Sequence, residues 1–405
     1  MQRIILLAYY YLPHTTSGVQ RAVRLAKYLP QYGYATSVIC AGHAGLQPKL
    51  EDVLHVPNEV VQSPRWLVSL ARMIQRILPY NEQLPWAVHA IAAARSVMAH
   101  GPVAAVVSTS PPLATHLAAL FLKKRHGLVW VADFRDPLVG NPGRARAWAK
   151  PYDAALERWI FQSATAVVGV TDAVVDAWRQ QYRRLAYKFH LIWNGFDPGD
   201  QFGPAQVPER PYRVLAHVGV LYVQRHPTAM LASLDRLVRQ RLVDPARLRL
   251  RFVGPIQQQE ELEGHLAAAS LLAQGCLEIR PGVIPREQAM LETATADALL
   301  LIDIVNLSNT GYTVPAKIYD YILTGRPILA LTDRDSPVDR ILQRAGIRYA
   351  CLYRDDIEAE TDRKLATFLD LPNEPLAPSP CFLENFDGER QAGRLAALLD
   401  ALTLH

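Results

Sequence analysis

The chain has 405 residues, of which half are hydrophobic and a fifth are charged; this composition is typical of globular proteins and excludes a disordered chain. The length exceeds what a single hydrophobic core usually serves, so we expect two domains of about 200 residues each. No apolar run reaches the ~18 residues that a membrane-spanning helix needs. The four cysteines form no CxxC pair, a pattern that favours reduced thiols in a cytoplasmic protein.

The charge of the chain is unevenly placed. The first 200 residues hold 21 Lys and Arg against 12 Asp and Glu, whereas the rest of the chain is net acidic, so the overall net charge of +5 conceals a basic N-terminal half. A basic half indicates an anionic partner, and both a membrane surface and a phosphorylated acceptor fit. Nucleic acid is not among the partners that we expect.

The N-terminal half alternates strands and helices from its first residues. Residues 4–8 and 36–41 have the apolar runs of buried strands, and the helix between them starts near Gly18 and Arg21 and ends near Gly33. No GxGxxG fingerprint follows the first strand, which argues against a dinucleotide site. Taken alone, Gly18 fits a tight turn and Arg21 fits a solvated helix start.

Residues 65–78 predict an amphipathic helix with a basic face. Arg65, Arg72 and Arg76 share one narrow side, and Trp66 lies among the apolar residues of the opposite side. A basic amphipathic helix that carries a Trp is typical of a membrane interface. An ordinary helix packed on its own domain fits the same pattern, and the sequence leaves both interpretations open.

Two further strands, 103–108 and 129–132, lead to polar motifs. The second delivers Asp133, Arg135 and Asp136 at its carboxyl end, which is where open α/β sheets bind ligands. A helix cap or a salt bridge to Arg135 is the alternative role for either carboxylate. The half closes with helices over 157–164 and 172–182, the latter capped by Thr171, with strands over 166–170 and 189–192, and with a linker rich in Pro and Gly over 198–211.

The second half again alternates strands and helices. It begins with a strand at 213–218 that leads into a G-V-L-Y-V-Q-R-H-P loop. Gly219 allows close approach of the backbone, and Arg225 suits a diphosphate, although a surface cation is the alternative. Further strands are predicted at 248–253, 277–279 and 349–352, and helices at 260–274 and 384–404.

The most informative stretch spans 298–331. A buried strand at 298–302 is followed by a polar loop, a helix that holds Pro315 in its first turn and ends at Gly325, and a second buried strand at 327–331. Backbone N–H groups at the start of such a helix suit a phosphate. Asp320 suits the two hydroxyls of a ribose, with a solvated helix residue as the alternative.

Several motifs carry a resemblance to a known family. The segment T-V-P-A-K-I-Y-D-Y-I-L-T-G-R-P-I-L-A-L resembles the donor-sugar segment of retaining family-4 glycosyltransferases of the GT-B fold. The opening Y-Y-Y-L-P…S-G-V-Q-R and the later S-T-S-P-P…W-V-A-D-F-R-D-P are similar to other parts of that family, and W-N-G-F-D is a common family feature at the domain junction. Asp320 falls at the second acidic position of the family motif, whereas Tyr312 stands in place of the first acid and Val220 in place of a frequent basic residue.

The resemblance implies an α/β fold of two Rossmann-like domains facing across a cleft (GT-B). The acceptor-side domain spans 1–197, a linker 198–211, the nucleotide-sugar-binding domain 212–384, and a helix at 385–405 packs back on the N-terminal domain. The donor-binding residues implied are Gly18, Gly219, Arg225, Val283, Thr310, Gly311, Tyr312, Thr313, Lys317 and Asp320. Asp133 and Asp136 stand where relatives have a sugar-contacting histidine, so we predict them as catalytic. The residues predicted to contact acceptor or membrane are Arg21, Arg65, Trp66, Arg72 and Arg76.

The implied function is that of a retaining, metal-independent glycosyltransferase. It moves a hexose or N-acetylhexosamine from a nucleotide diphosphate sugar to a lipid-linked glycan in bacterial surface polysaccharide synthesis. No cofactor is expected besides this co-substrate, and the isolated D-R-D at 333–335 is interpreted as a loop rather than a metal site. We expect a cytoplasmic protein, peripheral on the inner face of the cell membrane if helix 65–78 docks there. The alternatives are a nucleotide-sugar epimerase and a catalytically degenerate GT-B protein that binds glycan or scaffolds an assembly, which Tyr312 and Val220 favour.

Overall fold

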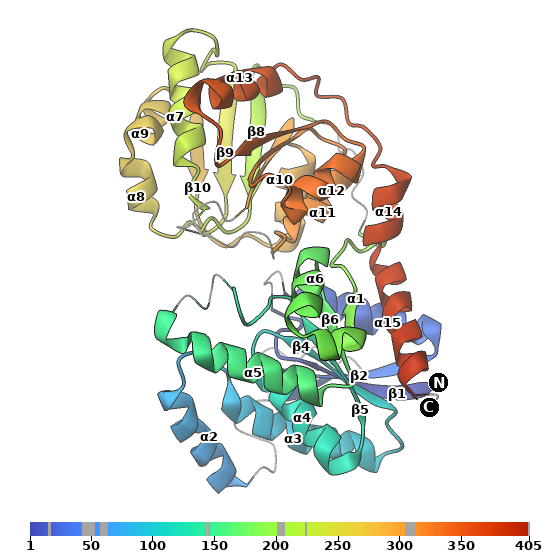
Figure 1. Ribbon diagram of the computed structural model, residues 1–405. Helices are drawn as coiled ribbons and strands as arrows, with labels where there is room; N and C mark the ends of the chain where they lie inside the picture. The colour runs from blue at the N-terminus through green and yellow to red at the C-terminus, as the bar shows by residue number, and fades with distance from the viewer. Residues whose placement is uncertain are drawn as a thin grey trace. The chain divides into compact units, whose positions relative to one another are not determined.

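The computed structural model describes residues 1–14, 18–42, 53–56, 64–141, 144, 146–200, 207–222, 225–303 and 313–403. The chain divides into two compact units, one formed by Met1–Pro198 with Asn385–His405 and the other by Gly199–Glu384. Each unit holds one sheet of parallel strands with helices on both of its faces (Figure 1). This is the alternating α/β architecture that the sequence predicts.

The first unit is built on a seven-stranded sheet with the strand order β3-β2-β1-β4-β5-β6-β7. Its strands are β1 (Gln2–Ala8), β2 (Tyr34–Ala41), β3 (Val53–Val56), β4 (Ala105–Ser110), β5 (Val129–Phe134), β6 (Ala166–Gly169) and β7 (Phe189–Leu191). Its helices are α1 (Val19–Tyr28), η1 (Leu29–Tyr32), α2 (Arg65–Ile77), α3 (Leu84–Ala99), α4 (Ala114–His126), η3 (Ala147–Ala149), α5 (Lys150–Ser163), α6 (Asp172–Gln181), η4 (Arg183–Lys188) and α15 (Gly388–Thr403). The predicted cap of α6 is confirmed, because Thr171 Oγ1 accepts a hydrogen bond from the backbone N–H of Val174 at 3.3 Å.

The second unit is built on a six-stranded sheet with the order β10-β9-β8-β11-β12-β13. Its strands are β8 (Arg213–Val218), β9 (Leu248–Val253), β10 (Leu277–Arg280), β11 (Ala298–Ile302), β12 (Ile328–Thr332) and β13 (Tyr349–Tyr353). Its helices are α7 (Thr228–Arg239), α8 (Gln259–Gly264), α9 (Leu266–Ala273), α10 (Arg286–Ala294), α11 (Lys317–Leu323), α12 (Pro337–Ala345), α13 (Glu358–Leu369) and α14 (Pro380–Phe386).

Several predicted helices have different bounds in the structure, and the one expected over 157–164 begins already at Lys150. The helix expected over 260–274 is two helices that meet at His265, and the one expected over 384–404 is α14 and α15, which meet at Asp387. The helix after Pro315 begins only at Lys317. A glycine marks both interruptions, Gly264 before His265 and Gly388 after Asp387, and a lone glycine within a helical pattern is a weak signal for a break.

In both sheets the chain starts on a central strand, adds strands on one side and then crosses to the other side. β1 lies between β2 and β4, and β8 lies between β9 and β11. Neighbouring crossovers diverge at such a switch point, which leaves room for a ligand at the carboxyl ends of the strands. We therefore expect functional residues just after β1, β4 and β5 in the first unit and just after β8 and β11 in the second.

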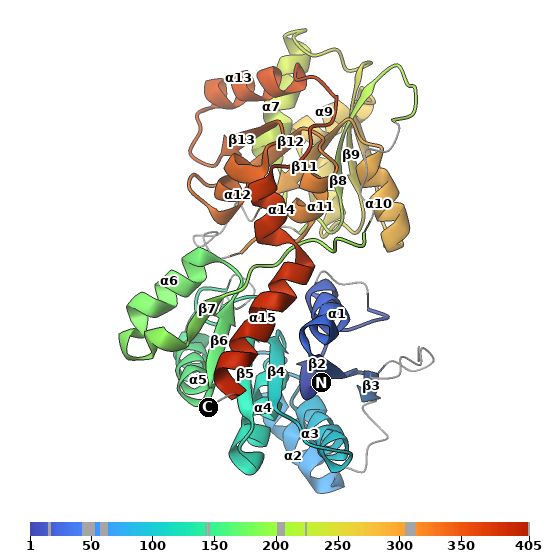
Figure 2. The ribbon, with the colours of Figure 1, turned by 90° about the vertical axis from the view of Figure 1, so that its right-hand side faces the viewer.

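Helix α15 completes the core of the first unit. Leu395 and Leu399 are buried together with Leu25 of α1, and Figures 1 and 2 show the two helices side by side. The chain reaches α15 through a backbone junction at Phe196. The N–H of Phe196 donates to the carbonyl of Phe386 at 3.0 Å, and the N–H of Gly388 donates to the carbonyl of Phe196 at 2.9 Å.

Gly195→Ala tests this junction. The added methyl group would overlap the carbonyl oxygen of Phe386, and that backbone cannot move without losing its bond to Phe196. We expect a melting temperature several degrees lower, because overpacking of this kind costs about 1–3 kcal/mol. Gly264→Ala is the control, since no atom lies within 4 Å of its added methyl group. Equal melting temperatures for the two variants would contradict the role of the junction.

Candidate functional site

Arg21 and Asp133 form a buried ion pair at the switch point of the first unit. Their exposed fractions are 5% and 2%. The Nη2 and Nε atoms of Arg21 lie 2.7 Å and 2.9 Å from the two carboxylate oxygens, a bidentate geometry. Its Nη1 donates to the carbonyl of Trp193 at 2.8 Å and approaches Asn194 Oδ1 at 3.3 Å. The pair thus joins α1, the end of β5 and the W-N-G-F-D segment.

This geometry corrects two expectations. Arg21 was predicted to contact the acceptor or a membrane, but α1 turns it toward the sheet, so it does not reach a membrane surface. The alternative that we gave for Asp133, a salt bridge to Arg135, names the wrong partner, because the carboxylate is held by Arg21. Asp133 as a catalytic group remains a prediction.

Arg135 holds the loop that leads into α1. Its Nε donates to the carbonyl of Ser110 at 2.9 Å, its Nη2 to that of Pro111 at 2.7 Å, and its Nη1 to that of Gly18. A methyl group at Gly18 would overlap the guanidinium of Arg135. The position of Arg135 is therefore sufficient reason for a glycine at residue 18. Burial lowers the pKa of Arg135, while the neighbouring charge of Asp136 opposes this shift. The donor role of Gly18 and the catalytic role of the half-buried Asp136 remain predictions.

The S-T-S-P-P motif forms a buried polar network rather than a catalytic centre. His116 is fully buried, and its two ring nitrogens each lie 2.8 Å from a serine hydroxyl, that of Ser108 and that of Ser110. The indole N–H of Trp130 donates to Ser108 at 2.8 Å. Burial lowers the pKa of His116 to about 3, so the imidazole is neutral at physiological pH. The network supports the ends of β4 and β5, which carry the residues described above.

A second polar cluster lies at the carboxyl end of β8 in the second unit. Gly219 follows this strand with φ +113°, a conformation that favours glycine, and a methyl group there would lie 3.1 Å from Lys317 Nζ. Lys317 Nζ also lies 3.0 Å from Nε2 of His217, which is 1% exposed. The backbone N–H of Val218 donates to the hydroxyl of Tyr321 at 2.9 Å. These contacts hold the start of α11 against the end of β8.

The electrostatics of this cluster favour an anion. Burial lowers the pKa of Lys317 to about 7, and the positive charge of Arg225 adds to this shift. Burial also lowers the pKa of His217 far below its usual value, helped by the charges of Lys317 and Arg225. Basic side chains that depress one another's pKa are stabilised when a negative group enters between them. A diphosphate is such a group.

Other predicted donor-site residues lie on the same unit. Thr313 is 9% exposed, and its Oγ1 has no hydrogen-bond partner among the described residues. One carboxylate oxygen of Asp320 lies 3.9 Å from an Nη atom of Arg286, at the start of α10. Val283, in the loop after β10, is 79% exposed. Their roles toward a nucleotide remain predictions.

Three further predicted residues, Thr310, Gly311 and Tyr312, lie outside the described residues. Among those that are described, no group of three or more His, Cys, Asp or Glu side chains is arranged to hold a metal ion. The D-R-D segment pairs with other side chains instead, since Asp333 accepts from Arg354 at 2.7 Å and Arg334 pairs with Asp356 at 2.7 Å.

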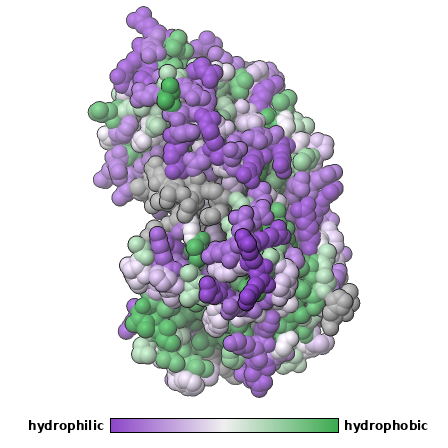
Figure 3. Space-filling view, in the orientation of Figure 1, coloured by the Kyte–Doolittle hydropathy of each residue, from purple (hydrophilic) through white to green (hydrophobic). Residues whose placement is uncertain are grey.

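The predicted basic amphipathic helix is α2, and its apolar side faces solvent. The helix packs on its unit through Val68 and Ala71. Its exposed apolar residues are Trp66, Leu70, Met73, Ile74 and Ile77, with exposed fractions between 36% and 79%. Figure 3 shows hydrophobic residues gathered at the lower left, over α2. The helix packs on its own unit and also exposes apolar residues, so the membrane helix and the ordinary helix packed on its own domain both remain predictions.

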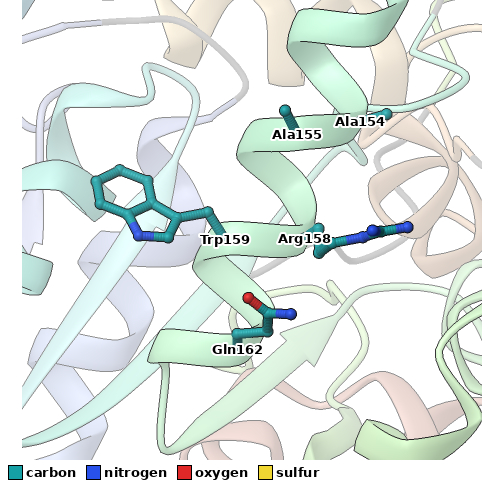
Figure 4. Close-up of a pocket in the computed structure, with 5 residues that line it drawn as sticks. All are labelled: Ala154, Ala155, Arg158, Trp159 and Gln162. Carbon is teal, nitrogen blue, oxygen red and sulfur yellow. The ribbon is translucent and has the colours of Figure 1, made fainter.

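A shallow pocket on the first unit is unrelated to the strand ends. All of its lining residues come from the surface of α5: Ala154, Ala155, Arg158, Trp159 and Gln162. Figure 4 shows Trp159 and Arg158 projecting to opposite sides of the helix. Since no second element contributes a polar group, this depression has no arrangement that would orient a substrate.

Sequence reasoning missed His217, Arg286 and Asn194 as members of the two clusters. His217 had a signal, because it is the polar residue within the apolar strand R-V-L-A-H-V, and a buried polar group requires a partner. Asn194 lies in the W-N-G-F-D motif, which was interpreted only as a domain junction. Arg286 had no signal, since it meets Asp320 through a contact that the local pattern does not encode.

The Arg21–Asp133 pair can be tested by separating stability from activity. Asp133→Asn and Arg21→Met should each lower the free energy of unfolding by about 3–5 kcal/mol, because each leaves a buried charge without its partner. The double variant Arg21→Met/Asp133→Leu should cost less than the sum, as judged by urea unfolding. Asp176→Asn, which breaks an exposed pair with Arg179, is the control and should change little. Full stability with lost activity in Asp133→Asn would instead make Asp133 a catalytic group.

The comparisons with known proteins agree with these observations. Residues 17–200 match the family model described as Glycosyltransferase Family 4, whereas no curated protein matches the chain. Among solved structures, HepE from Anabaena in complex with UDP and glucose has a TM-score of 0.64 at 12% identity, covering 99% of this chain and 100% of that one. WaaG, a glycosyltransferase involved in lipopolysaccharide biosynthesis, has a TM-score of 0.57 at 17% identity, covering 99% and 97%.

A third solved structure, sucrose-phosphate synthase from Thermosynechococcus elongatus, has a TM-score of 0.62 at 13% identity, covering 100% of this chain and 97% of that one. At these identities the likeness shows the fold, and the family model supplies the class of activity. None of the helices in the described ranges is long and apolar enough to cross a bilayer. The chain is therefore a glycosyltransferase built from the two Rossmann-like units of the GT-B fold, and its residues 17–200 match glycosyltransferase family 4.

Proposed function

We propose that the protein is a retaining glycosyltransferase that moves a hexose or N-acetylhexosamine from a nucleotide diphosphate sugar to a lipid-linked glycan in bacterial surface polysaccharide synthesis. The observation that carries this proposal is the basic cluster of Lys317 and Arg225 beside Gly219 at the carboxyl end of β8. HepE, a solved structure of the same fold, is described in complex with UDP. WaaG, another, acts in lipopolysaccharide biosynthesis.

The basic cluster suits the diphosphate of the donor. Lys317 and Arg225 are close enough for each charge to disfavour the other, and a diphosphate relieves that repulsion. Charge also develops on the diphosphate as the sugar leaves, so fixed cations at this point stabilise the transition state. Gly219 leaves the backbone open beside the amine of Lys317. The buried hydroxyl of Thr313 is a further donor for a phosphate oxygen.

Asp320 suits the ribose of the same nucleotide. Its carboxylate is partly exposed and carries two acceptor oxygens, which match a pair of adjacent hydroxyls. Arg286 lies 3.9 Å from one of these oxygens and places a positive charge beside the carboxylate. The exposed loop with Val283 follows β10 on this unit and is the proposed contact for the base.

The proposed reaction needs no protein nucleophile and no cofactor or metal ion. An acceptor hydroxyl attacks the anomeric carbon on the face from which the diphosphate departs. The new C–O bond forms as the C–O bond to the phosphate breaks, and a phosphate oxygen takes the hydroxyl proton. The configuration at the anomeric carbon is retained. Asp133 and Asp136 are proposed to act near the sugar, Asp136 through its partly exposed carboxylate.

We further propose that α2 docks the enzyme on an anionic membrane, where a lipid-linked acceptor resides. Its apolar side points away from Val68 and Ala71, the residues by which the helix packs on its own unit. Arg65, Arg72 and Arg76 are exposed along the flank of the same helix. Apolar side chains that enter the acyl boundary, with Arg beside the headgroups, are the arrangement of interfacial helices. The basic character of the N-terminal half adds attraction to anionic lipid.

One observation favours the alternative function, that of a catalytically degenerate GT-B protein. Val220 stands beside Gly219 where relatives often have a basic residue, so the diphosphate would meet fewer cations. Such a protein would still have the fold but would not turn over a donor. A nucleotide-sugar epimerase would need an acidic pair and histidines about the sugar, and the sequence does not display that set.

Donor binding is tested first by thermal shift with UDP, GDP, ADP, CMP and dTDP. We expect UDP to raise the melting temperature, because a ligand that binds only the folded state stabilises it by mass action. Lys317→Met and Asp320→Ala should each weaken UDP binding about tenfold or more, whereas Asp370→Ala, at an exposed carboxylate of the same unit, should not. The lack of any shift with all five nucleotides would favour the degenerate protein.

Membrane docking is tested by flotation with vesicles of phosphatidylcholine alone and with added phosphatidylglycerol. We expect the protein to float only with the anionic vesicles, and Arg72→Glu/Arg76→Glu and Trp66→Ser/Ile77→Ser each to reduce the bound fraction severalfold. The control Arg390→Glu/Arg394→Glu makes the same charge change at two exposed arginines of α15. If all three variants lose binding equally, the net charge and not α2 is responsible.

A further inference from the structure

The histidine at the end of β8 has a fixed tautomer. His217 Nδ1 lies 3.0 Å from the carbonyl oxygen of Leu300 on the neighbouring strand. A carbonyl only accepts, so Nδ1 carries the hydrogen and Nε2 presents a lone pair. That lone pair faces Lys317 Nζ at 3.0 Å. The imidazole therefore offers the amine an acceptor, and the backbone of Val220 is a further neighbour of the same ring.

Burial keeps the imidazole in this role. His217 is 1% exposed, and the ring of Phe252 on β9 lies 6.1 Å from its own ring. Desolvation first, and the positive charge of Lys317 second, hold the pKa of His217 far below its usual value. The ring remains neutral throughout the physiological range, so Lys317 always meets an uncharged acceptor and not a second cation at this point.

Among the described residues, the amine of Lys317 has no counter-ion that holds it in place. No ion pair joins it to a carboxylate in the part of the chain that the structure describes. The carboxylates nearest in the fold have other partners: Asp320 lies beside Arg286, and Asp303 at the end of β11 accepts from the hydroxyl of Thr332 at 3.2 Å. A neutral acceptor directs the amine but, unlike a carboxylate, does not stabilise its positive charge.

The other titratable groups around the amine either lower the pKa of Lys317 further or leave it unchanged. Arg225, which follows β8, adds positive charge and so disfavours a second cation. Tyr321, one turn further along α11, is bonded to the backbone of Val218, and burial raises its pKa, so it stays neutral. Lys317 thus has a pKa of about 7 through burial and through Arg225, which leaves the amine near the midpoint of its titration at neutral pH.

We propose that His217 is a positioning residue of the donor site: it aims the amine of Lys317 past Gly219 toward the donor diphosphate, and because it supplies no counter-charge, nucleotide binding takes up a proton at this amine. The inference rests on the proposed function, since it needs a diphosphate at the cluster. Beyond that function, the inference assigns a role to His217, which does not contact the nucleotide itself, and predicts that nucleotide binding consumes a proton.

The sign of the pH dependence follows from linkage. A bound diphosphate favours the charged amine and raises its pKa, so proton binding and nucleotide binding strengthen each other by the same factor. Affinity for UDP is greatest below the pKa of the free amine. It falls by up to about tenfold per pH unit as the pH rises above 7, until the raised pKa of the complex is passed. Titration of UDP itself is common to all variants and cancels when they are compared at each pH.

The test measures UDP binding by calorimetry from pH 6.5 to 9 for matched variants. His217→Asn places an amide N–H near the position of Nδ1 and keeps the bond to Leu300, but its shorter side chain does not reach Lys317. His217→Gln reaches Lys317 with an amide oxygen and gives up the bond to Leu300. We expect Asn to weaken UDP binding about tenfold at pH 7, and Gln to restore it to within about threefold of the wild type.

Two further readouts separate positioning from a merely structural role. In buffers of different ionisation enthalpy, wild-type protein should take up about half a proton per UDP at pH 7, and Lys317→Met close to none. In the Lys317→Met background, His217→Asn should have no further effect on UDP affinity. Melting temperatures without ligand show whether each variant is folded.

The outcomes distinguish this inference from the proposed function. Wild-type protein that binds no nucleoside diphosphate overturns both. UDP binding without proton uptake, or with the same affinity and pH profile in His217→Asn, overturns the inference alone and leaves the transferase proposal in place. A loss in His217→Asn that is equally large without Lys317 also overturns it, since His217 would then act through the strand and not through the amine.

Discussion

Parallel strand pairing is the constraint on which the rest of this structure depends. Because the strands of each sheet run the same way, the loops that follow them meet at one edge, and residues far apart in the sequence become neighbours there. Arg21 and Asp133 are 112 residues apart, and Lys317 and His217 are 100 residues apart. Helices on both faces keep these sheets buried, which leaves that edge as the place where polar groups can gather.

The two units use charge at this edge in different ways. In the first unit, Arg21 is neutralised by Asp133, and Arg135 is bound by three backbone carbonyls. Such charges are satisfied within the protein, and they order the loops around them. In the second unit, Lys317 has a neutral imidazole as its partner and Arg225 nearby. A diphosphate, as proposed, would relieve the repulsion between the charges of Lys317 and Arg225.

The sequence predicted the strands well, since a continuous run of buried apolar residues is a local signal; β8, β9 and β11 have the predicted bounds. The ends of helices were harder to predict, as at His265, where α8 ends at Gly264 within a stretch whose pattern had predicted one continuous helix. Site residues could be named where a motif carried them, as for Lys317 and Asp320, but their partners could not. The identity of a partner such as His217 depends on which strands become neighbours, and this is a property of the whole sheet.

The return of the chain's last segment to the first unit has a consequence for biosynthesis. The ribosome synthesises Met1–Pro198 long before it synthesises α15, whose Leu395 and Leu399 fill the core beside α1. At ordinary elongation rates the interval is on the order of ten seconds or more. During that time the apolar face of α1 lacks its cover, so a nascent or truncated chain presents a surface that chaperones and proteases recognise. Completion of the first unit therefore waits until α15 has been synthesised.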